Sequence, residues 1–561
     1  MVKVHYVIAV AIVASCVACI NFSCIISLFY KYINRHEIID IRQLNWTSSV
    51  RCSLSNGTRL CSFKNVCYLP KKHLFLFTLT EHSVLLGLSS KEDLKTIYLS
   101  SVVNHNLMSM KIAIVSNENK VTENAMFIDQ SLFLLWRFKW DNIMHVFHDD
   151  LIPLFLTYLD ICGEISRCTS KYTLGFVDRG EGGPYHELYS LFSNQQPLLL
   201  HKYTNTVCFP ELHSGVLSSS VWFQYGFGQT QGPVNTSVPI EILHQFKDYV
   251  VHRLGISKKL VNNNAVIFLN RKLNRKILNL EYFTSILYNT VKEAYPSSEP
   301  KIIELDLTTH NIALLIEVFL TSKIVVGMHG SAMILCLFLI PGSVVFELLP
   351  FGIQPENVSF IKAFTEITGS EIVYRSWVNC NETLSFAHPE APPLLGGIYH
   401  LPKAKQEFIL NTKIVPAVEC CHDPLYLFRM FQDTEVGSDF IPRFQEALLA
   451  QQLFSKETVK TTYLNKLFSS WYFPAPATNV SCTFQHQTLT AMWQPSINAI
   501  DSLIYDISIL LDNNTILSKF TPYPNLKINL SYTAYTAEIW IKAVSFDSES
   551  LDSHSKCQRK I

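Results

Sequence analysis

The stretch that decides the fold is KIVVGMHGSAMILCLFLIPGSVVFELLP, residues 323–350. Its two ends are apolar along their whole length and predict two buried strands joined by a short apolar helix. Such strands, alternating with helices, indicate a parallel sheet covered on both faces. His329 and Gly330 follow the first strand, at the sheet edge where ligands collect. A helix starting near Ser331 would point free N–H groups at an anion there; the alternative is a buried, internally bonded histidine.

The preceding residues predict the rest of this sheet. NAVIFLNR (264–271) predicts a buried strand whose end carries Arg271, Asn274 and Arg275, and two further helices and a strand follow before residue 323. Two arginines beside a helix start make a chemically sensible diphosphate site, although surface arginines are the alternative. Glu347 closes the next strand and could accept hydrogen bonds from ribose hydroxyls, unless it is a solvated acid. Neither a G-x-G-x-x-G nor a P-loop motif is present, which argues against dehydrogenases and P-loop ATPases.

A second polar group lies in WDNIMHVFHDDLIPLFLTYL (140–159), whose apolar residues recur at helical spacing. His145, His148 and Asp149 fall towards one side of this helix, and Asp150 lies further round. We predict that the general base is one of His148, Asp149 and Asp150, because one partner tunes the pKa of another. They could equally be acids favoured in the first turn of a helix. An HDD sequence could also attract Mn²⁺, but the arginines and a helix dipole can neutralise a diphosphate without it. We therefore predict no metal site.

Composition and the N-terminus predict the compartment. Lys plus Arg and Asp plus Glu each number 46 in 561 residues, so nucleic acid is not an expected partner. Residues 1–30 are long and apolar enough for a membrane anchor, with a cleaved signal peptide as the alternative. Twelve cysteines follow, without metal-ligand spacing, and favour disulfides in an oxidising lumen. Eight Asn-X-Ser/Thr sites, which are candidates for N-glycosylation, also indicate exposure to the secretory lumen: Asn45, Asn56, Asn235, Asn357, Asn381, Asn479, Asn513 and Asn529.

The remaining segments complete the organisation. Residues 31–60 are polar and predict a lumenal stem. From residue 474 to 561, short alternating runs with an early Trp493 and a late Tyr535 predict a β-sandwich similar to a fibronectin type III domain. Cys482 and Cys557 lie near its two ends and are candidates for a disulfide. Such modules usually bind or position partners.

The ordered motifs, taken together, resemble a known family, the protein O-linked-mannose β-1,4-N-acetylglucosaminyltransferases that glycosylate dystroglycan. The motifs are DNIMHVFHDDLIPLF, WFQYGFGQTQGP, LNRKLNR, MHGSAMILCLFLIPGSVVFELLP, HPEAPPLLGGIYHL and CCHDPLYLFRMFQDT, in that order. The chain departs from the family at Ser331, where Ala is more common, and at Pro393, where Trp is usual. Loss of that Trp removes a natural platform for a sugar of the acceptor.

The resemblance implies an α/β protein of two Rossmann-like domains facing a cleft (GT-B type), behind an N-terminal transmembrane helix in the endoplasmic reticulum, single-pass type II. Residues 61–240 would form the acceptor-side domain with the base, and residues 241–455 the UDP-sugar domain. UDP-GlcNAc would be the donor and an O-mannosylated protein the acceptor, with inversion. Donor-binding candidates are Arg271, Asn274, Arg275, Met328, His329, Gly330, Ser331 and Glu347.

Two other functions fit these features. A related transferase would add GlcNAc directly to Ser or Thr of extracellular domains, with the same fold and donor. A lectin-like binding protein would keep the fold without activity. The sequence leaves the oligomeric state open, a homodimer included.

Overall fold

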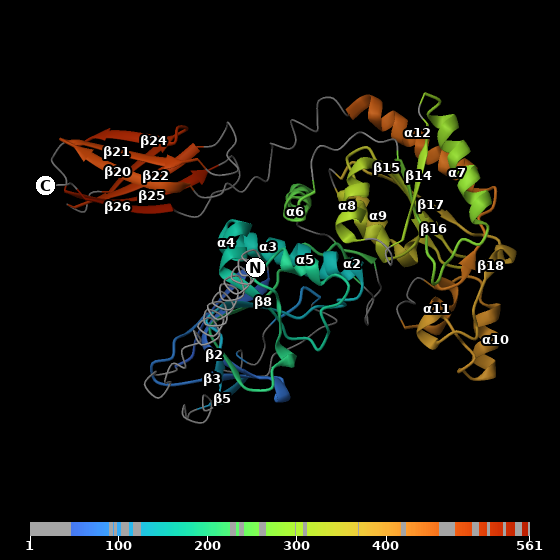
Figure 1. The fold of residues 1–561 in the computed structure, drawn as a ribbon, viewed down its shortest axis with the longest axis horizontal. Coiled ribbons are helices and arrows are strands. Elements are labelled where there is room, and N and C mark those ends of the chain that lie inside the picture. Colours follow the sequence, from blue (N-terminus) through green and yellow to red (C-terminus); the bar gives the residue numbers. More distant parts are fainter. Residues whose placement is uncertain are drawn as a thin grey trace, which may run out of the picture.

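The structure is a computed structural model that describes residues 47–558 (Figure 1), apart from residues 56, 89–93, 95–97, 103–111, 116–124, 225–231, 235–239, 257–264, 298, 307–310, 368–369, 417–421, 459–476, 496–503, 513–515, 531–534 and 545–552. The predicted anchor at residues 1–30 lies outside the described residues. Among the helices that are described, none is long and apolar enough to cross a membrane.

The N-terminal body is built on a mixed ten-stranded sheet with the path β4-β1-β2-β10-β7-β8-β9. β1 pairs antiparallel with β2, and β10 returns antiparallel to the other edge of β2. β7, β8 and β9 are parallel to one another. The main strands are β1 (Ser49–Ser55), β2 (Thr58–Leu69), β3 (Leu74–Thr78), β4 (Leu85–Leu86), β5 (Ile112–Val115), β7 (Ser131–Leu135), β8 (Tyr172–Phe176), β9 (Leu198–Leu199) and β10 (Val207–Ser214).

The prediction of two Rossmann-like domains in a GT-B arrangement is wrong, because a Rossmann sheet is mostly parallel and this sheet contains antiparallel β1, β2 and β10. The cause is partly local: Gly57, with a φ of 77°, turns the chain between β1 and β2, as Gly commonly does in tight hairpins. Residues 49–55 and 58–60, predicted as stem, are therefore strands of the sheet. The protein is a mixed α/β structure of several sheets.

One long helix follows β7 and contains an irregular turn. It consists of α2 (Ile143–His145), the π-helical turn η5 (Val146–Leu151) and α3 (Ile152–Cys162). The Asn142 side chain caps its start by accepting the Met144 N–H at 3.0 Å. α4 (Ile165–Lys171) and α5 (His186–Ser190) complete this body, and α6 (Ile240–Arg253) follows it.

The C-terminal body contains the predicted parallel sheet, in the order β14-β13-β15-β16-β17. Its strands are β13 (Ala265–Leu269), β14 (Lys301–Leu305), β15 (Ser322–Met328), β16 (Val344–Leu349) and β17 (Val373–Val378). Helices α7 (Leu280–Ala294) and α12 (Phe440–Thr458) cover one face, while α8 (Ile312–Thr321), the 3-10 helix η7 (Ser331–Phe338) and α9 (Phe360–Thr365) cover the other (Figure 1). The buried strands predicted within residues 323–350 are confirmed. A smaller lobe carries α10 (Lys403–Asn411) and α11 (Pro424–Met430).

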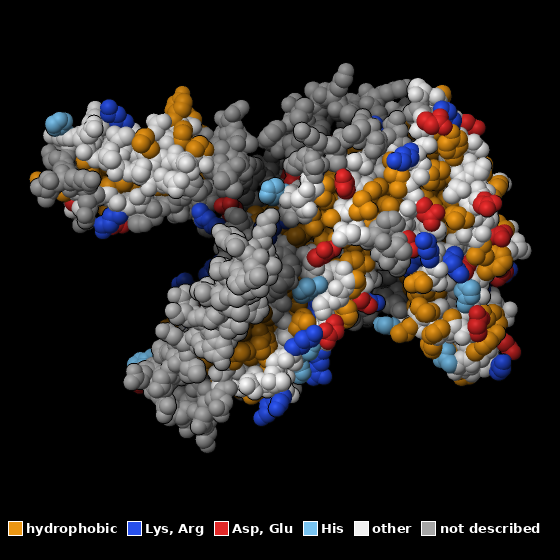
Figure 2. All heavy atoms as spheres, in the orientation of Figure 1, with side chains coloured by type: hydrophobic (Ala, Val, Ile, Leu, Met, Phe, Trp, Pro, Cys, Tyr) orange, Lys and Arg blue, Asp and Glu red, His pale blue; other side chains and the backbone are white. Residues whose placement is uncertain are grey.

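A continuous apolar core joins the two bodies. Side chains of the α2–α3 helix, α6, α8, η7 and α9 belong to one buried cluster. Phe147 packs against Phe338 with ring centroids 5.5 Å apart, and the Trp222 indole N–H donates to the Phe360 carbonyl oxygen at 3.4 Å. The helix after β7 is therefore fixed against the helices of the parallel sheet. In Figure 2, basic and acidic side chains are interspersed over the visible face of the C-terminal body, as the zero net charge implies.

The last described segment is a two-sheet β-sandwich. One sheet has the order β20-β21-β24 and the other β23-β22-β25-β26. Trp493 packs on Tyr505 with ring centroids 5.2 Å apart, and the predicted Cys482–Cys557 disulfide is confirmed. The strands are β20 (Thr478–Gln485), β21 (Thr488–Gln494), β22 (Ile504–Leu511), β23 (Ile516–Thr521), β24 (Asn525–Asn529), β25 (Thr536–Val544) and β26 (Ser553–Gln558).

Three more disulfides, whose pairing the sequence left open, are Cys52–Cys61, Cys67–Cys208 and Cys162–Cys168. Among the predicted glycosylation sites, Asn357 is 1% exposed and its amide nitrogen donates to the Pro416 carbonyl, so it cannot carry a glycan in this fold. Asn381, Asn479 and Asn529 are exposed. Asn45, Asn56, Asn235 and Asn513 lie outside the described residues.

Candidate active site

Two arginines lie at the carboxyl end of β13, and Asn274 holds them. The Asn274 Oδ1 atom accepts from Arg271 Nη2 at 2.8 Å and lies 3.5 Å from Arg275 Nε, while its carbonyl oxygen accepts from Arg271 Nε at 3.2 Å. Arg275 Nη1 donates to the His329 carbonyl oxygen at 2.6 Å. The structure therefore brings four predicted donor-site residues together across β13 and β15.

The two guanidinium groups are not directly paired with carboxylates of the described residues, although the charge of Asp306 acts on Arg271 and that of Glu347 acts on Arg275. Neither guanidinium forms an ion pair with a carboxylate of a described residue. Burial lowers the pKa of Arg275 well below its usual range, and the charge of Arg271 lowers it further. Arg275 also has a φ of 54°, a left-handed conformation that is uncommon for a non-glycine residue and often found at functional sites. Two adjacent guanidinium groups that are not directly paired with a carboxylate are suited to a multiply charged anion such as a diphosphate.

Gly330 gives the guanidinium groups room beside the backbone. A Cβ atom at this position would lie 2.4 Å from Arg271 Nη1 and 3.4 Å from Arg275 Nη1. The residue is also the N-cap of η7, whose first residue, Ser331, is partly exposed. Free N–H groups at the start of η7 therefore lie next to the two arginines.

His329 is oriented from behind by Glu347. The His329 Nδ1 and Glu347 Oε1 atoms are 2.7 Å apart, and the Tyr374 hydroxyl donates to Glu347 Oε2 at 2.6 Å. Because Glu347 is fully buried and both oxygens are engaged, it cannot contact a ribose as predicted. It instead positions His329, whose side chain is 17% exposed and whose Nε2 has no hydrogen bond to a described residue. Met328, another predicted donor-site residue, is 2% exposed and belongs to the core.

The second polar group is an aspartate between two imidazoles. Asp149 Oδ2 lies 2.6 Å from His145 Nδ1, and Asp149 Oδ1 lies 2.6 Å from His148 Nδ1. Burial raises the pKa of Asp149, but the interactions with His148 and His145 outweigh it and bring the pKa to about 2. Asp149 is therefore a carboxylate that holds both rings. These residues lie at the π-helical turn η5, a feature frequently found at functional sites.

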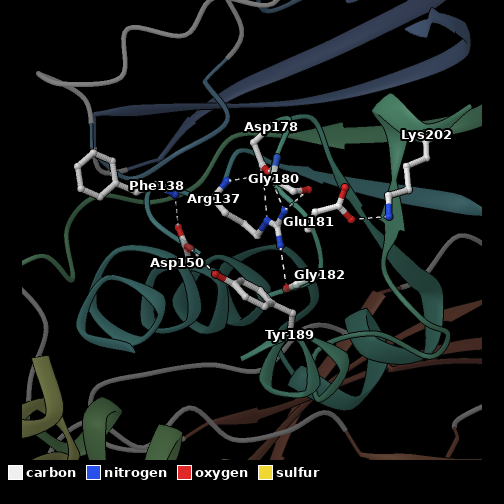
Figure 3. Close-up of polar contacts among 9 residues, drawn as sticks. All are labelled: Arg137, Phe138, Asp150, Asp178, Gly180, Glu181, Gly182, Tyr189 and Lys202. Carbon is white, nitrogen blue, oxygen red and sulfur yellow. Dashed lines mark hydrogen bonds and ion pairs between the residues drawn. The ribbon is translucent and has the colours of Figure 1, made fainter. Parts of the chain in front are cut away.

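Asp150 belongs to a different network, drawn in Figure 3. Its carboxyl group accepts from the Tyr189 hydroxyl at 2.6 Å and from the Phe138 main-chain N–H at 3.3 Å. Burial raises the pKa of Asp150 well above its ordinary value. Beside it, Arg137 forms a buried ion pair with Asp178, with Nη2 and Oδ1 2.6 Å apart. This network supports the loop after β8, and both oxygens of Asp150 are occupied, so the residue is not placed to act as a base.

The helices next to the two polar groups, α2 and η7, are in contact. α2 follows the carboxyl end of β7, η7 follows the carboxyl end of β15, and α2 packs against η7. The helix that carries His145 and Asp149 is therefore in contact with the helix that follows His329 and Gly330, although the two groups are almost two hundred residues apart in the sequence. Among the described residues, no three His, Cys, Asp or Glu side chains are arranged to hold a metal ion.

A pair of arginines at the carboxyl edge of a parallel sheet is suited to binding a phosphate-activated donor, and comparisons with known proteins give the class of protein. The family model described as glycosyltransferase 61 matches residues 143–346. The chain is 30% identical to protein O-linked-mannose beta-1,4-N-acetylglucosaminyltransferase 2 of Tetraodon nigroviridis, over 92% of this chain and 90% of that protein. The proteins of the same name from Xenopus tropicalis and Homo sapiens are each 32% identical, over 72% and 70% of this chain and 71% and 67% of theirs.

The chain belongs to this O-linked-mannose N-acetylglucosaminyltransferase family of glycosyltransferases. Three residues of the site were absent from the predicted set. Tyr374 carries no local signal, because its partner Glu347 lies on the neighbouring strand, β16. Trp222, which bonds to His148, is equally remote in sequence. The sequence placed His145 on the same side of the helix as His148 and Asp149, as its spacing of four residues from Asp149 requires, but His145 was not among the predicted catalytic residues.

Proposed function

We propose that the chain transfers N-acetylglucosamine from UDP-GlcNAc to O-linked mannose on a dystroglycan-type protein acceptor, in β-1,4 linkage and with inversion. The observation that carries this proposal is the pair of guanidinium groups of Arg271 and Arg275, held together beside Gly330 without a direct ion pair to a carboxylate of a described residue. The sugar, the linkage and the O-linked mannose acceptor are those named for the relatives.

The groups at the edge of the parallel sheet can stabilise the negative charge of the departing diphosphate. Arg271 and Arg275 would bind its oxygens, the N–H groups at Gly330 and Ser331 would add hydrogen bonds, and His329 Nε2 would face the same anion. Such preorganised donors stabilise charge that develops in the transition state and are often the largest contribution to catalysis. Because these groups can balance the diphosphate charge, the proposed reaction needs no metal ion.

The proposed compartment is the lumen of the endoplasmic reticulum, with residues 1–30 as a type II anchor. The four disulfides support an oxidising compartment. The assignment of the sandwich to the fibronectin type III class, and a role for it in positioning the acceptor, belong to the same proposal. A homodimer remains a prediction.

The test is turnover of UDP-GlcNAc on a synthetic O-mannosyl peptide and on the same peptide without mannose, each with and without EDTA. We expect transfer to the mannosyl peptide only, at a rate that EDTA does not change. Transfer to the bare peptide would indicate direct O-GlcNAc addition to Ser or Thr. No transfer to either peptide, with UDP still bound, would indicate a lectin-like protein and refute the proposal.

A further inference from the structure

The histidine within the π-helical turn, His148, is not available for chemistry. His148 is fully buried, and the Trp222 main-chain N–H donates to its Nε2 at 3.1 Å. Its proton must therefore lie on Nδ1, which donates to Asp149. Edge-to-face packing on Trp222 and Phe360, with ring centroids 4.2 and 5.0 Å away, fixes the ring. His148 is a neutral anchor for Asp149.

His145 occupies a different position in the same cluster. The Asp149 Oδ2 atom lies 2.6 Å from His145 Nδ1, so Nδ1 is the nitrogen held by the carboxylate and Nε2 is the nitrogen on the other side of the ring. The His145 side chain is 11% exposed, whereas those of His148 and Asp149 are fully buried. His145 also lies in the first turn after β7, in the helix segment that packs against η7.

We propose that His145 is the general base of the transfer, that Asp149 positions it, and that His148 and Trp222 hold Asp149 in place. This inference rests on the proposed function. In the reaction, the acceptor hydroxyl transfers its proton to His145 Nε2 as its oxygen forms a bond to C1 of N-acetylglucosamine. The bond between C1 and the diphosphate oxygen breaks, and its electron pair leaves with UDP at Arg271 and Arg275. Asp149 stabilises the imidazolium that results, as a carboxylate does in other histidine-based sites.

His145→Asn tests this assignment, because the Asn amide N–H can still donate to Asp149 while the base is removed. In the full-length protein we expect kcat for the mannosyl peptide to fall by about 10²- to 10⁴-fold, the range for a positioned general base. We expect the KM for UDP-GlcNAc, the calorimetric UDP affinity and the melting temperature to stay near wild type. The acid limb of the pH–rate profile should disappear, which loss of a merely structural residue would not cause.

A second variant and a control make the outcome decisive. In His145→Ala, added imidazole should restore part of the lost rate, while His252→Ala, an exposed histidine on α6, should leave the rate unchanged. A kcat of His145→Asn within about threefold of wild type, far below the loss expected for a general base, would overturn the assignment and leave the proposed function standing. A wild-type protein without transfer would overturn the proposed function itself.

Discussion

Gly330→Ala is a sharp test of the donor site, because it adds a single methyl group at the point where the two arginines meet the backbone. The φ of Gly330 is 161°, which is extended backbone that alanine can adopt, so the substitution should not strain the main chain. The new Cβ atom would lie 2.4 Å from Arg271 Nη1. Ordinary van der Waals contact begins at 3.4 Å, so the guanidinium must move by about 1 Å.

A displacement of that size sets the expected effect. Misplacing a substrate-positioning group by about 1 Å can cost on the order of 10²-fold in rate, which corresponds to about 2.7 kcal/mol of transition-state stabilisation. We expect kcat/KM for UDP-GlcNAc to fall by about this factor and the UDP affinity to weaken. The melting temperature should stay near wild type, because the moved group is the end of a flexible side chain.

The matched control is Gly182→Ala, where the nearest atom to a new Cβ is 3.4 Å away, on the His186 side chain. This variant should keep wild-type kinetics. The assignment of the diphosphate to Arg271 would be refuted if Gly330→Ala kept a kcat/KM within about twofold of wild type. Displacing a binding group by about 1 Å is expected to reduce the rate by far more than this.

Two further predictions concern stability. The pKa of Asp149 in the folded protein is about 2, below its ordinary value of 3.8, so its stabilisation is present above pH 3.8 and is lost as the pH falls through 2. In urea unfolding, the wild type should therefore lose about 2 kcal/mol more free energy of unfolding than Asp149→Asn between pH 5 and pH 2. Equal losses in the two proteins would contradict an ionised Asp149. Arg137→Met leaves the buried Asp178 without its guanidinium partner and should lower the free energy of unfolding by about 3–5 kcal/mol. The double variant Arg137→Met/Asp178→Asn should regain part of this stability, because the unpaired charge is removed. A loss of less than about 1 kcal/mol in Arg137→Met would contradict a stabilising role of this ion pair.

The parallel sheet and its cationic edge could be predicted because their determinants are local. Apolar strands at 265–269, 324–328 and 344–349 need cover on both faces, and parallel strands place their carboxyl ends at one edge. Arg271, Arg275 and His329 follow such ends, and therefore meet. The N-terminal sheet could not be predicted in this way. β10 pairs with β2 across more than 130 residues, and nothing in either strand specifies that partner.

The roles of the acidic cluster show a second limit of sequence reasoning. Helical spacing places His145, His148 and Asp149 on one side and Asp150 further round, yet the predicted catalytic group consists of the adjacent residues His148, Asp149 and Asp150. On a helix, however, neighbouring residues point in directions about 100° apart. Asp149 therefore faces His145 and His148, while Asp150 faces Tyr189 on the other side. The residue that remains partly exposed, His145, lies one helical turn before Asp149. For a polar run on a helix, spacings of three and four residues are a better guide to a shared site than adjacency.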